Sequence, residues 1–426
     1  MRHDLIALSC YATVALCAPA PTAWGQEQPN QPRLEPHFAV KPAPTGEYEK
    51  IKNDLAATGS TQASTLPLWL FRVEASRNHQ DYTGVMVGAD PFTPEGKKDV
   101  SVAAFVVPLI VVTHTIATAV DLTTGQFTVA PGATTMDPTA ATACLSPPNN
   151  VPASLLEESP IFRPAHFRFG ATDVGTAQYV DAFQRGNFWQ ALGMAGTTDA
   201  YHVRLDPVQT VAPVVLEVPA ASGLAITDPL LLGPPALCAP FGIIDINWVD
   251  DYLAGKVLPA LAAQGVSPSN LPLFLLSNVM MSSDVSDYFS CCTHGYHNET
   301  GLPIQTYVVS DFDTSGYWLY PIAASVEDSG GVSHEVAEWM NDPFGNNPVP
   351  SWGHIGQQGG CQRNLEVGDP LSGTAFPAVV MPNGFTYHLQ ELAFFSWFFG
   401  APSIGANGWF SDNGTFATDA GPVCQQ

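Results

Sequence analysis

Residues 331–343 read GVSHEVAEWMNDP and hold the side chains best suited to metal chemistry in this sequence. His334 and Glu338 are four residues apart, so on a helix they share one face and can bind one ion. Glu335 follows His334 directly, as the general base does in the HExxH motif of zinc hydrolases. In those enzymes the metal lowers the pKa of a bound water, and the glutamate takes the water's proton. The spacing therefore predicts His334 and Glu338 as metal ligands and Glu335 as the catalytic base.

The segment departs from HExxH because Glu338 stands where the second histidine would be. A carboxylate is an accepted zinc ligand, but it lowers the net charge of the ion and so its Lewis acidity. The ordinary alternative is a first helical turn in which glutamates favour the helix dipole and the histidine has no function. Ser333 is a suitable N-cap and Asp342-Pro343 a suitable stop, so we expect a helix of roughly two to three turns between them.

A catalytic zinc needs three protein ligands and an open position, so a third ligand is expected downstream. Glu366 and Asp369, in the stretch LEVGDP, have suitable side chains, and Glu366 ranks first. Asp342, one turn further along the helix, and His354 are competitors. Cys361 is close enough in sequence to fix this stretch through a disulfide. The predicted metal site is therefore His334, Glu338 and Glu366, with the third ligand left open among these four residues.

Two more histidines precede the helix, in CCTHGYH at residues 291–297. An apolar strand is expected at 304–310, and the edge of a strand before such a helix can hold an extended peptide. His294 and His297 are within reach of the predicted site. The interpretation favoured by sequence is that one of them is structural and the other is a loop residue.

The combination of GYH, an apolar strand, SHExxExxxDP and ExxD resembles that of the secreted plant phosphate-induced (exordium-type) proteins and their bacterial and fungal relatives. The matching stretch runs over residues 291–369, under a fifth of the chain. Those relatives are zinc-metallopeptidase-like proteins. The resemblance implies metal-site roles for His334, Glu335, Glu338 and Glu366. This sequence departs from the family pattern after ExxD, where a cysteine is expected and Pro370 follows Asp369.

The rest of the chain must supply a framework for this helix. Short β-branched or aromatic runs alternate with two long amphipathic patterns, which favours an α+β or mixed α/β fold. We expect a zincin-like metal-site helix packed on a mixed sheet, with a β-rich N-terminal part. The expected strands are 66–73, 82–87, 100–112, 126–129, 271–280 and 304–310, and the expected helices are 176–192 and 245–264.

The N-terminus predicts export. Residues 5–20 are largely apolar and Ala23-Trp24-Gly25 fits a small-x-small cleavage site, so residues 1–25 are expected to be a signal peptide. Residues 26–65 are predicted to be a Pro/Gln-rich linker, 66–150 a β-rich region and 151–426 a metallopeptidase-like α/β domain. The expected location is secreted or periplasmic.

Cysteine usage agrees with an oxidising destination. Eight cysteines are present and two lie in the predicted signal, which leaves six for disulfides. Bridging adjacent residues strains the backbone, so Cys291 and Cys292 are expected to pair with different partners.

Composition excludes several partner classes. With 15 Lys+Arg and 39 Asp+Glu, the net charge is −24, which repels nucleic-acid phosphates and anionic membranes. No second apolar span long enough for a membrane is found, so no transmembrane segment is expected in the mature protein. The acidic surface attracts cations. Zinc is the expected cofactor, and calcium is the alternative at acid pairs such as Asp311 with Asp313, which lack EF-hand spacing.

Two functions follow as hypotheses. The first is a secreted metal-dependent zinc hydrolase of peptidase type, acting on a peptide or cell-wall substrate with metal-activated water. The second is a non-catalytic extracellular or cell-wall binding protein, or a pseudo-enzyme whose metal is structural. The replacement of histidine by Glu338 and the missing cysteine favour the second. The sequence predicts neither the substrate nor the oligomeric state.

Overall fold

The computed structural model describes residues 37–40, 45–59, 64–93, 99–196, 198–233, 236–317, 327–353 and 361–418, together with Gly421 and Cys424. Residues 34–426 form one compact unit. The predicted signal peptide and much of the predicted linker lie outside the described residues, so these two assignments stay predictions. Among the described residues, no helix is both long and apolar enough to cross a membrane.

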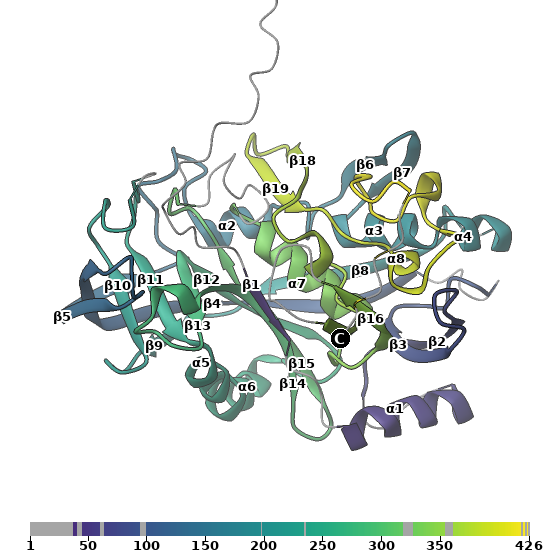
Figure 1. Cartoon of the computed structure of the whole chain (residues 1–426), viewed down its shortest axis with the longest axis horizontal. Helices are drawn as coiled ribbons and strands as arrows, with labels where there is room; N and C mark the ends of the chain where they lie inside the picture. The colour runs from purple at the N-terminus through teal and green to yellow at the C-terminus, as the bar shows by residue number, and fades with distance from the viewer. Residues whose placement is uncertain are drawn as a thin grey trace, which may run out of the picture. The chain divides into compact units, whose positions relative to one another are not determined.

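The central element is a closed barrel of seven strands (Figure 1). Around the barrel the order is β14 (Cys291–Thr300), β13 (Val279–Ser282), β11 (Phe241–Asp245), β10 (Gly223–Ile226), β4 (Asp99–Val120), β12 (Leu271–Ser277) and β15 (Gln305–Phe312). The barrel closes because β15 also pairs with β14, antiparallel and in a register that sets Gly295 opposite Ser310. Parallel pairs join β4 to β12 and β12 to β15.

The expected fold class is therefore wrong. Among the described residues the structure is mostly β, with 39% in strands and 23% in helices, and its sheet is a closed barrel rather than the open mixed sheet of a zincin-like α+β or mixed α/β fold. The apolar runs do form strands near the expected positions. Their pattern does not show which edges meet, and closure depends on a single antiparallel pairing between β14 and β15.

Further strands extend or surround the barrel. Strand β4 is 22 residues long, so it also pairs with β5 (Phe127–Met136), β8 (His202–Thr210) and β9 (Val214–Glu217). Of the strands in residues 66–150, β4 and β5 thus share a sheet with later parts of the chain, whereas β2 and β3 do not. Strand β1 (His37–Val40) runs parallel to β14. Four hairpins complete the strands: β2 (Leu68–Glu74) with β3 (Asp81–Val87), β6 (Ala165–Phe169) with β7 (Thr172–Ala177), β16 (Pro348–Gly353) with β17 (Cys361–Asn364), and β18 (Ala375–Val380) with β19 (Thr386–Gln390).

Both faces of the barrel wall are apolar, which explains why its strands read as continuous apolar runs. On β4, Val102, Ala104 and Val106 belong to the largest core cluster, whereas Phe105 and Val107, on the opposite face of the strand, belong to a second cluster. The second cluster draws residues from most of the barrel strands and from the helical segment 246–264. Two buried faces demand apolar residues at every position rather than at alternate ones.

The expected helices are present, although each is broken. Residues 176–192 hold α3 (Tyr179–Asn187) and the start of α4 (Trp189–Ala195). Residues 245–264 hold α5 (Ile246–Tyr252), a π-helical turn and α6 (Leu258–Leu261). The other α-helices among the described residues are α1 (Thr45–Thr58), α2 (Pro152–Glu157), α7 (Gly330–Asn341) and α8 (Phe395–Phe399).

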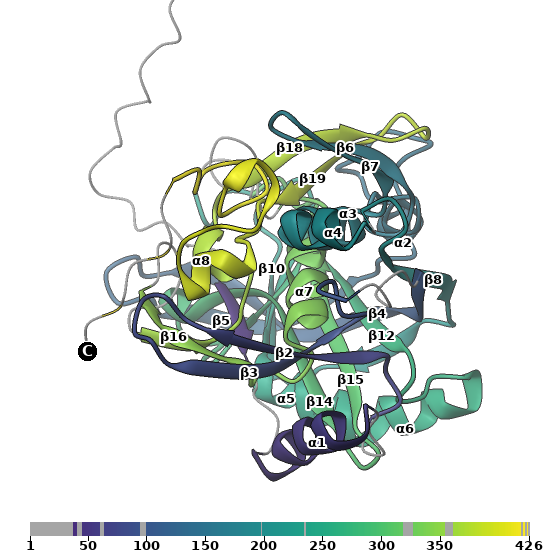
Figure 2. The same cartoon turned by 90° about the vertical axis from the view of Figure 1, so that its right-hand side faces the viewer.

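Helix α7 is the predicted metal-site helix, and every one of its residues is buried. It lies against β14 and β15 on the outside of the barrel, and β19, α3 and β3 contact its other sides (Figures 1 and 2). Ser333 is not its N-cap. The helix begins a turn earlier, at Gly330, because Gly331 fits closely over β15, where an added Cβ would lie 3.1 Å from Ser310 Oγ. Its end at Asn341, before Asp342, confirms the predicted stop.

The six cysteines after the predicted signal form three disulfides. Cys144 pairs with Cys238, and Cys361 pairs with Cys424, which ties the start of β17 to the C-terminal residues. Cys291 pairs with its neighbour Cys292. The expectation that these two would serve different partners is wrong.

Candidate metal centre

Helix α7 carries three of the four predicted site residues on adjoining faces. His334 and Glu338 lie one turn apart, with His334 Nε2 3.0 Å from Glu338 Oε1. Both side chains are at most 1% exposed. The i, i+4 spacing thus brings an imidazole and a carboxylate together, as the sequence predicts.

The segment 365–369 approaches the same face of α7. The backbone N–H groups of Gly368 and Asp369 donate to Glu338 Oε1 over 3.0 and 3.1 Å. The Asp369 carboxylate turns back toward the helix, and its Oδ1 lies 3.7 Å from His334 Nε2. His334, Glu338 and Asp369 each offer a ligand atom, and these atoms all lie within 4.8 Å of one another. We call this the helix group.

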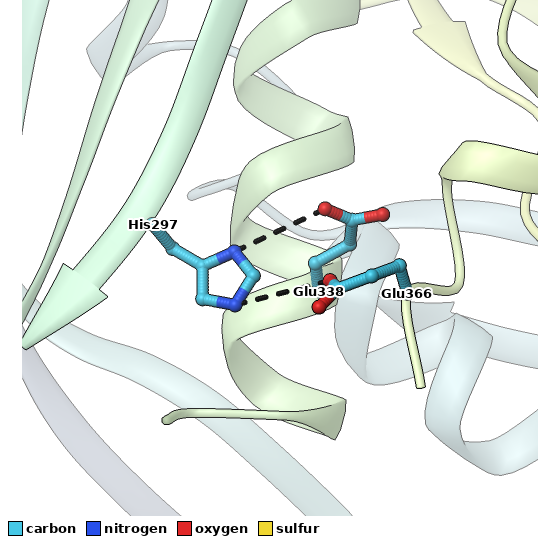
Figure 3. A group of neighbouring side chains, drawn as sticks. All are labelled: His297, Glu338 and Glu366. Atoms are coloured by element: carbon cyan, nitrogen blue, oxygen red, sulfur yellow. Dashed lines mark ion pairs between the residues drawn. The ribbon is translucent and has the colours of Figure 1, made fainter. Parts of the chain in front are cut away.

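Glu366 belongs to a second group, with Glu338 and His297 of β14 (Figure 3). His297 Nδ1 lies 3.9 Å from Glu338 Oε2, and its Nε2 lies 3.8 Å from Glu366 Oε2. The ligand atoms of this strand group also lie within 4.8 Å of one another. The predicted set His334, Glu338 and Glu366 is thus divided, because Glu366 meets His297 and Asp369 meets His334, with Glu338 common to both groups.

Glu335 faces the barrel strand that carries His297. Its Oε2 lies 3.3 Å from His297 Nδ1, and the side chain is fully buried. It packs directly over Gly295, where an added Cβ would lie 2.5 Å from Glu335 Cγ. Residues 295 and 297 point to the same face of a strand, so a glycine followed by a histidine gives Glu335 both space and a polar partner.

Two amides hold the ligands in orientation. His334 Nδ1 lies 2.9 Å from Gln390 Oε1, and the same amide donates from Nε2 to Gly368 O over 2.6 Å. With Nδ1 held by Gln390, the His334 ring points Nε2 toward Glu338, and Nε2 is the nitrogen that a metal would bind. Asn364 Nδ2 likewise donates to Glu366 Oε1 over 2.7 Å.

The carboxylates of the centre are hard to ionise together. Burial, followed by the charge of Glu338, raises the pKa of Glu335, Glu366 and Asp369 well above the usual range. Burial opposes ionisation of Glu338 too, but His334 and then His297 outweigh it and lower the pKa of that carboxyl. The acids of this buried site therefore compete for positive charge.

Several ligand atoms have no hydrogen-bond partner within the described part of the chain. They are Glu335 Oε1, Glu366 Oε2, Asp369 Oδ1 and His297 Nε2. Their residues are at most 1% exposed, and the ion pairs that the structure shows for these carboxylates are with histidines rather than with Lys or Arg. A buried acceptor without a donor is costly, and a cation would satisfy it. The buried His, Glu and Asp groups could therefore hold a metal ion.

The remaining candidates have other positions. Asp342 accepts hydrogen bonds from the backbone N–H of Asn346 and Asn347, over 3.0 and 2.9 Å, and so orders the turn after α7. His354 lies outside the described residues. His294 lies on β14, so neither histidine of that segment is a loop residue.

Calcium-type acids are also present away from α7. Asp311 and Asp313 are buried at the end of β15, and they accept backbone hydrogen bonds from Val279 and Ser315. A third potential ligand group, of Glu327, Asp328 and His388, lies before α7 and on β19. In that group the Asp328 carboxylate already accepts from Ser329, His388 N and His388 Nδ1.

The site predicted from the sequence includes neither His297 nor Gln390. The signal for His297 was available, because GYH places a glycine and a histidine on the same face of a predicted strand next to the HExxE helix. Gln390 gave no such signal. It is 56 residues from His334, and only the fold of β19 against α7 brings the two together.

Comparison with family models, with curated proteins and with solved structures found no match for this chain. The resemblance to the exordium-type proteins therefore stays a prediction.

Proposed function

We propose that this chain is an exported, metal-dependent hydrolase of peptidase type, with zinc bound beside α7. The observation that carries the proposal is the convergence of His334, Glu338 and Asp369 in a buried site, with Glu335 next to them. This set replaces the sequence-based set by exchanging Glu366 for Asp369 in the helix group. The exordium-type resemblance supports the same class of activity.

Zinc suits the donor types better than calcium does. The centre offers two imidazoles among its carboxylates, and imidazole nitrogen is a common zinc ligand, whereas calcium selects sites made of oxygen. The contact of Gln390 with Nδ1 leaves Nε2 of His334 facing the centre, and Nε2 is the nitrogen that such an ion needs.

When bound, the ion would supply the positive charge that polarises a substrate carbonyl and acidifies a water. Glu335 then acts as the proton acceptor. Its Oε1 has no hydrogen-bond partner, whereas its Oε2 faces His297 Nδ1, which keeps the carboxylate turned toward the centre. A proton taken at Glu335 can be passed to the leaving amine, as general acid–base catalysis requires.

The test uses two variants of the full chain. His334→Ala is expected to lose the bound zinc, measured by metal analysis of purified protein. Glu335→Gln is expected to keep the zinc but to cleave peptide libraries at least 100-fold more slowly, since a positioned general base contributes about 10²–10⁴-fold. Glu74→Gln is the control because its side chain is 63% exposed on β2. Absence of stoichiometric zinc from both wild type and His334→Ala would contradict the proposal.

A second candidate is a non-catalytic extracellular protein with a structural metal. The burial of His334, Glu338 and Asp369 to at most 1% exposure favours it, because a catalytic ion needs a position open to substrate. In that case, metal removal would unfold the protein while Glu335→Gln would match wild type against peptides and cell-wall polymers.

Export is part of the proposal. Three disulfides among the described residues support an oxidising destination. N-terminal sequencing of the protein recovered outside the producing cell is expected to begin near residue 26. A chain that stays inside the cell with Met1 intact would contradict this.

A further inference from the structure

We propose that the centre is dinuclear, with the Glu338 carboxylate bridging two divalent cations. One cation would bind in the helix group with His334 and Asp369, and the other in the strand group with His297 and Glu366. This rests on the metal centre of the proposed function and goes beyond it in the number of ions and in the role of β14.

The first observation is the orientation of Glu338. Its Oε1 lies 3.0 Å from His334 Nε2, whereas its Oε2 lies 3.9 Å from His297 Nδ1. The two oxygens of one carboxylate therefore face two different imidazoles, one on α7 and one on β14. A bridging carboxylate has this arrangement, and the ions of two-metal sites lie about 3.5–4 Å apart.

The second observation is that each group keeps its own acceptor without a hydrogen-bond partner. In the helix group this is Asp369 Oδ1, and in the strand group it is Glu366 Oε2, which lies 3.8 Å from His297 Nε2. One ion in the helix group would leave Glu366 Oε2 unsatisfied, and one ion in the strand group would do the same to Asp369 Oδ1. Two ions satisfy both.

The third observation is the charge of the centre. Glu335, Glu338, Glu366 and Asp369 carry four formal negative charges when ionised, and all are at most 1% exposed. A single divalent ion would leave two of these charges buried and uncompensated, and burying unpaired charge costs free energy. Two divalent ions balance all four. Further oxygen ligands would come from water.

The experiment counts ions in the full chain. Wild type is loaded with Zn²⁺, dialysed against metal-free buffer and measured by metal analysis, with two zinc ions per chain expected. Asp369→Asn removes a charged ligand from the helix group only, and Glu366→Gln does so in the strand group only. Each variant is expected to retain one ion, and the double variant none.

Manganese gives a second measurement that does not depend on variant stability. The wild-type chain with one equivalent of Mn²⁺ and then two is examined by electron paramagnetic resonance. Two ions bridged by Glu338 are expected to show an exchange-coupled spectrum at two equivalents. Uncoupled signals at both ratios would overturn the bridge.

The outcomes separate the two proposals. One zinc per wild-type chain would overturn the dinuclear centre and leave the proposed hydrolase intact, whereas no zinc would overturn both. His388→Ala tests the third group and is expected to retain two ions. A fall to one ion in His388→Ala, with two retained in Glu366→Gln, would overturn the assignment of the second ion to His297 and Glu366.

Discussion

Two regions of this protein bury carboxylates, and they differ in the hydrogen bonds that these carboxylates accept. Beside β19, Glu391 accepts hydrogen bonds from Ser411, from Thr415 N and from Thr415 Oγ1, and Asp412 accepts from Tyr179 and Leu392 N. Beside α7, by contrast, three carboxylates keep an oxygen without a hydrogen-bond partner. Burial alone therefore does not mark a ligand site. Unsatisfied acceptors next to histidines are the better mark, because a cation would complete them.

Metal removal gives the largest expected difference between the two regions. Treating the full chain with a chelator is expected to lower its unfolding free energy by about 4 kcal/mol, if ligand is present at about 1,000 times its dissociation constant. Thermal and urea unfolding with and without chelator measure this change. Asp412→Asn is expected to keep the chelator effect and Glu338→Gln to lose it. An effect that survives in Glu338→Gln would place the ion elsewhere.

Gly368→Ala is expected to disturb the region beside α7 and not the region beside β19, without removing a ligand. The added Cβ would lie 2.4 Å from His334 Nδ1, so the imidazole must move away from Gln390. We expect a loss of about 1–3 kcal/mol in stability, measured by urea unfolding, together with weaker zinc binding. Gly255→Ala is the matched control because nothing lies within 4 Å of its added Cβ. Equal zinc affinity in both variants would contradict the role given to His334.

Gln390→Ala tests orientation without removing a ligand. The amide fixes the His334 ring, and loss of such an outer partner lowers metal affinity by about 10–100-fold. Zinc competition titration against a chromophoric chelator measures the change. Gln178→Ala is a suitable control, because that buried amide bonds the backbone of Phe162 and Leu205 and no residue of the metal centre. Unchanged zinc affinity in Gln390→Ala would show that packing alone orients the imidazole.

The remaining prediction concerns the pH dependence of the region beside β19. Burial, and then Glu391, raises the pKa of Asp412 well above its usual range. The folded state therefore binds this proton more tightly than the unfolded state, so the contribution of Asp412 is greatest at acidic pH and declines as pH rises above about 4. Asp412→Asn is expected to flatten this decline, by at most about 1.4 kcal/mol per pH unit, in unfolding free energies measured from pH 4 to 8. The same slope in both proteins would contradict the assignment.

Sequence could predict the parts of this site that are close together in the chain. The i, i+4 spacing of His334 and Glu338, and the neighbouring Glu335, follow from the geometry of one helix. The division between Glu366 and Asp369 could not be predicted, because it depends on how Gly368 turns the chain against α7. The backbone N–H bonds from Gly368 and Asp369 to Glu338 set that turn.

The barrel was harder to predict from the sequence than the site was. Apolar runs such as 271–280 predicted strands, and two strands lie there, β12 and β13. They are separated at Asn278, whose positive φ of 56° turns the chain, so β12 pairs with β4 and β15 while β13 pairs with β11 and β14. No pattern of apolar residues reveals that choice of partners. It decides both the closure of the barrel and the approach of His297 to α7.

Metal analysis of wild type beside Glu338→Gln tests the central claim most directly, because Glu338 is the residue common to both ligand groups. After loading with Zn²⁺ and dialysis, we expect stoichiometric zinc in wild type and none in Glu338→Gln, with both proteins folded by circular dichroism. Equal zinc content in the two proteins, or none in wild type, would contradict a metal centre on α7.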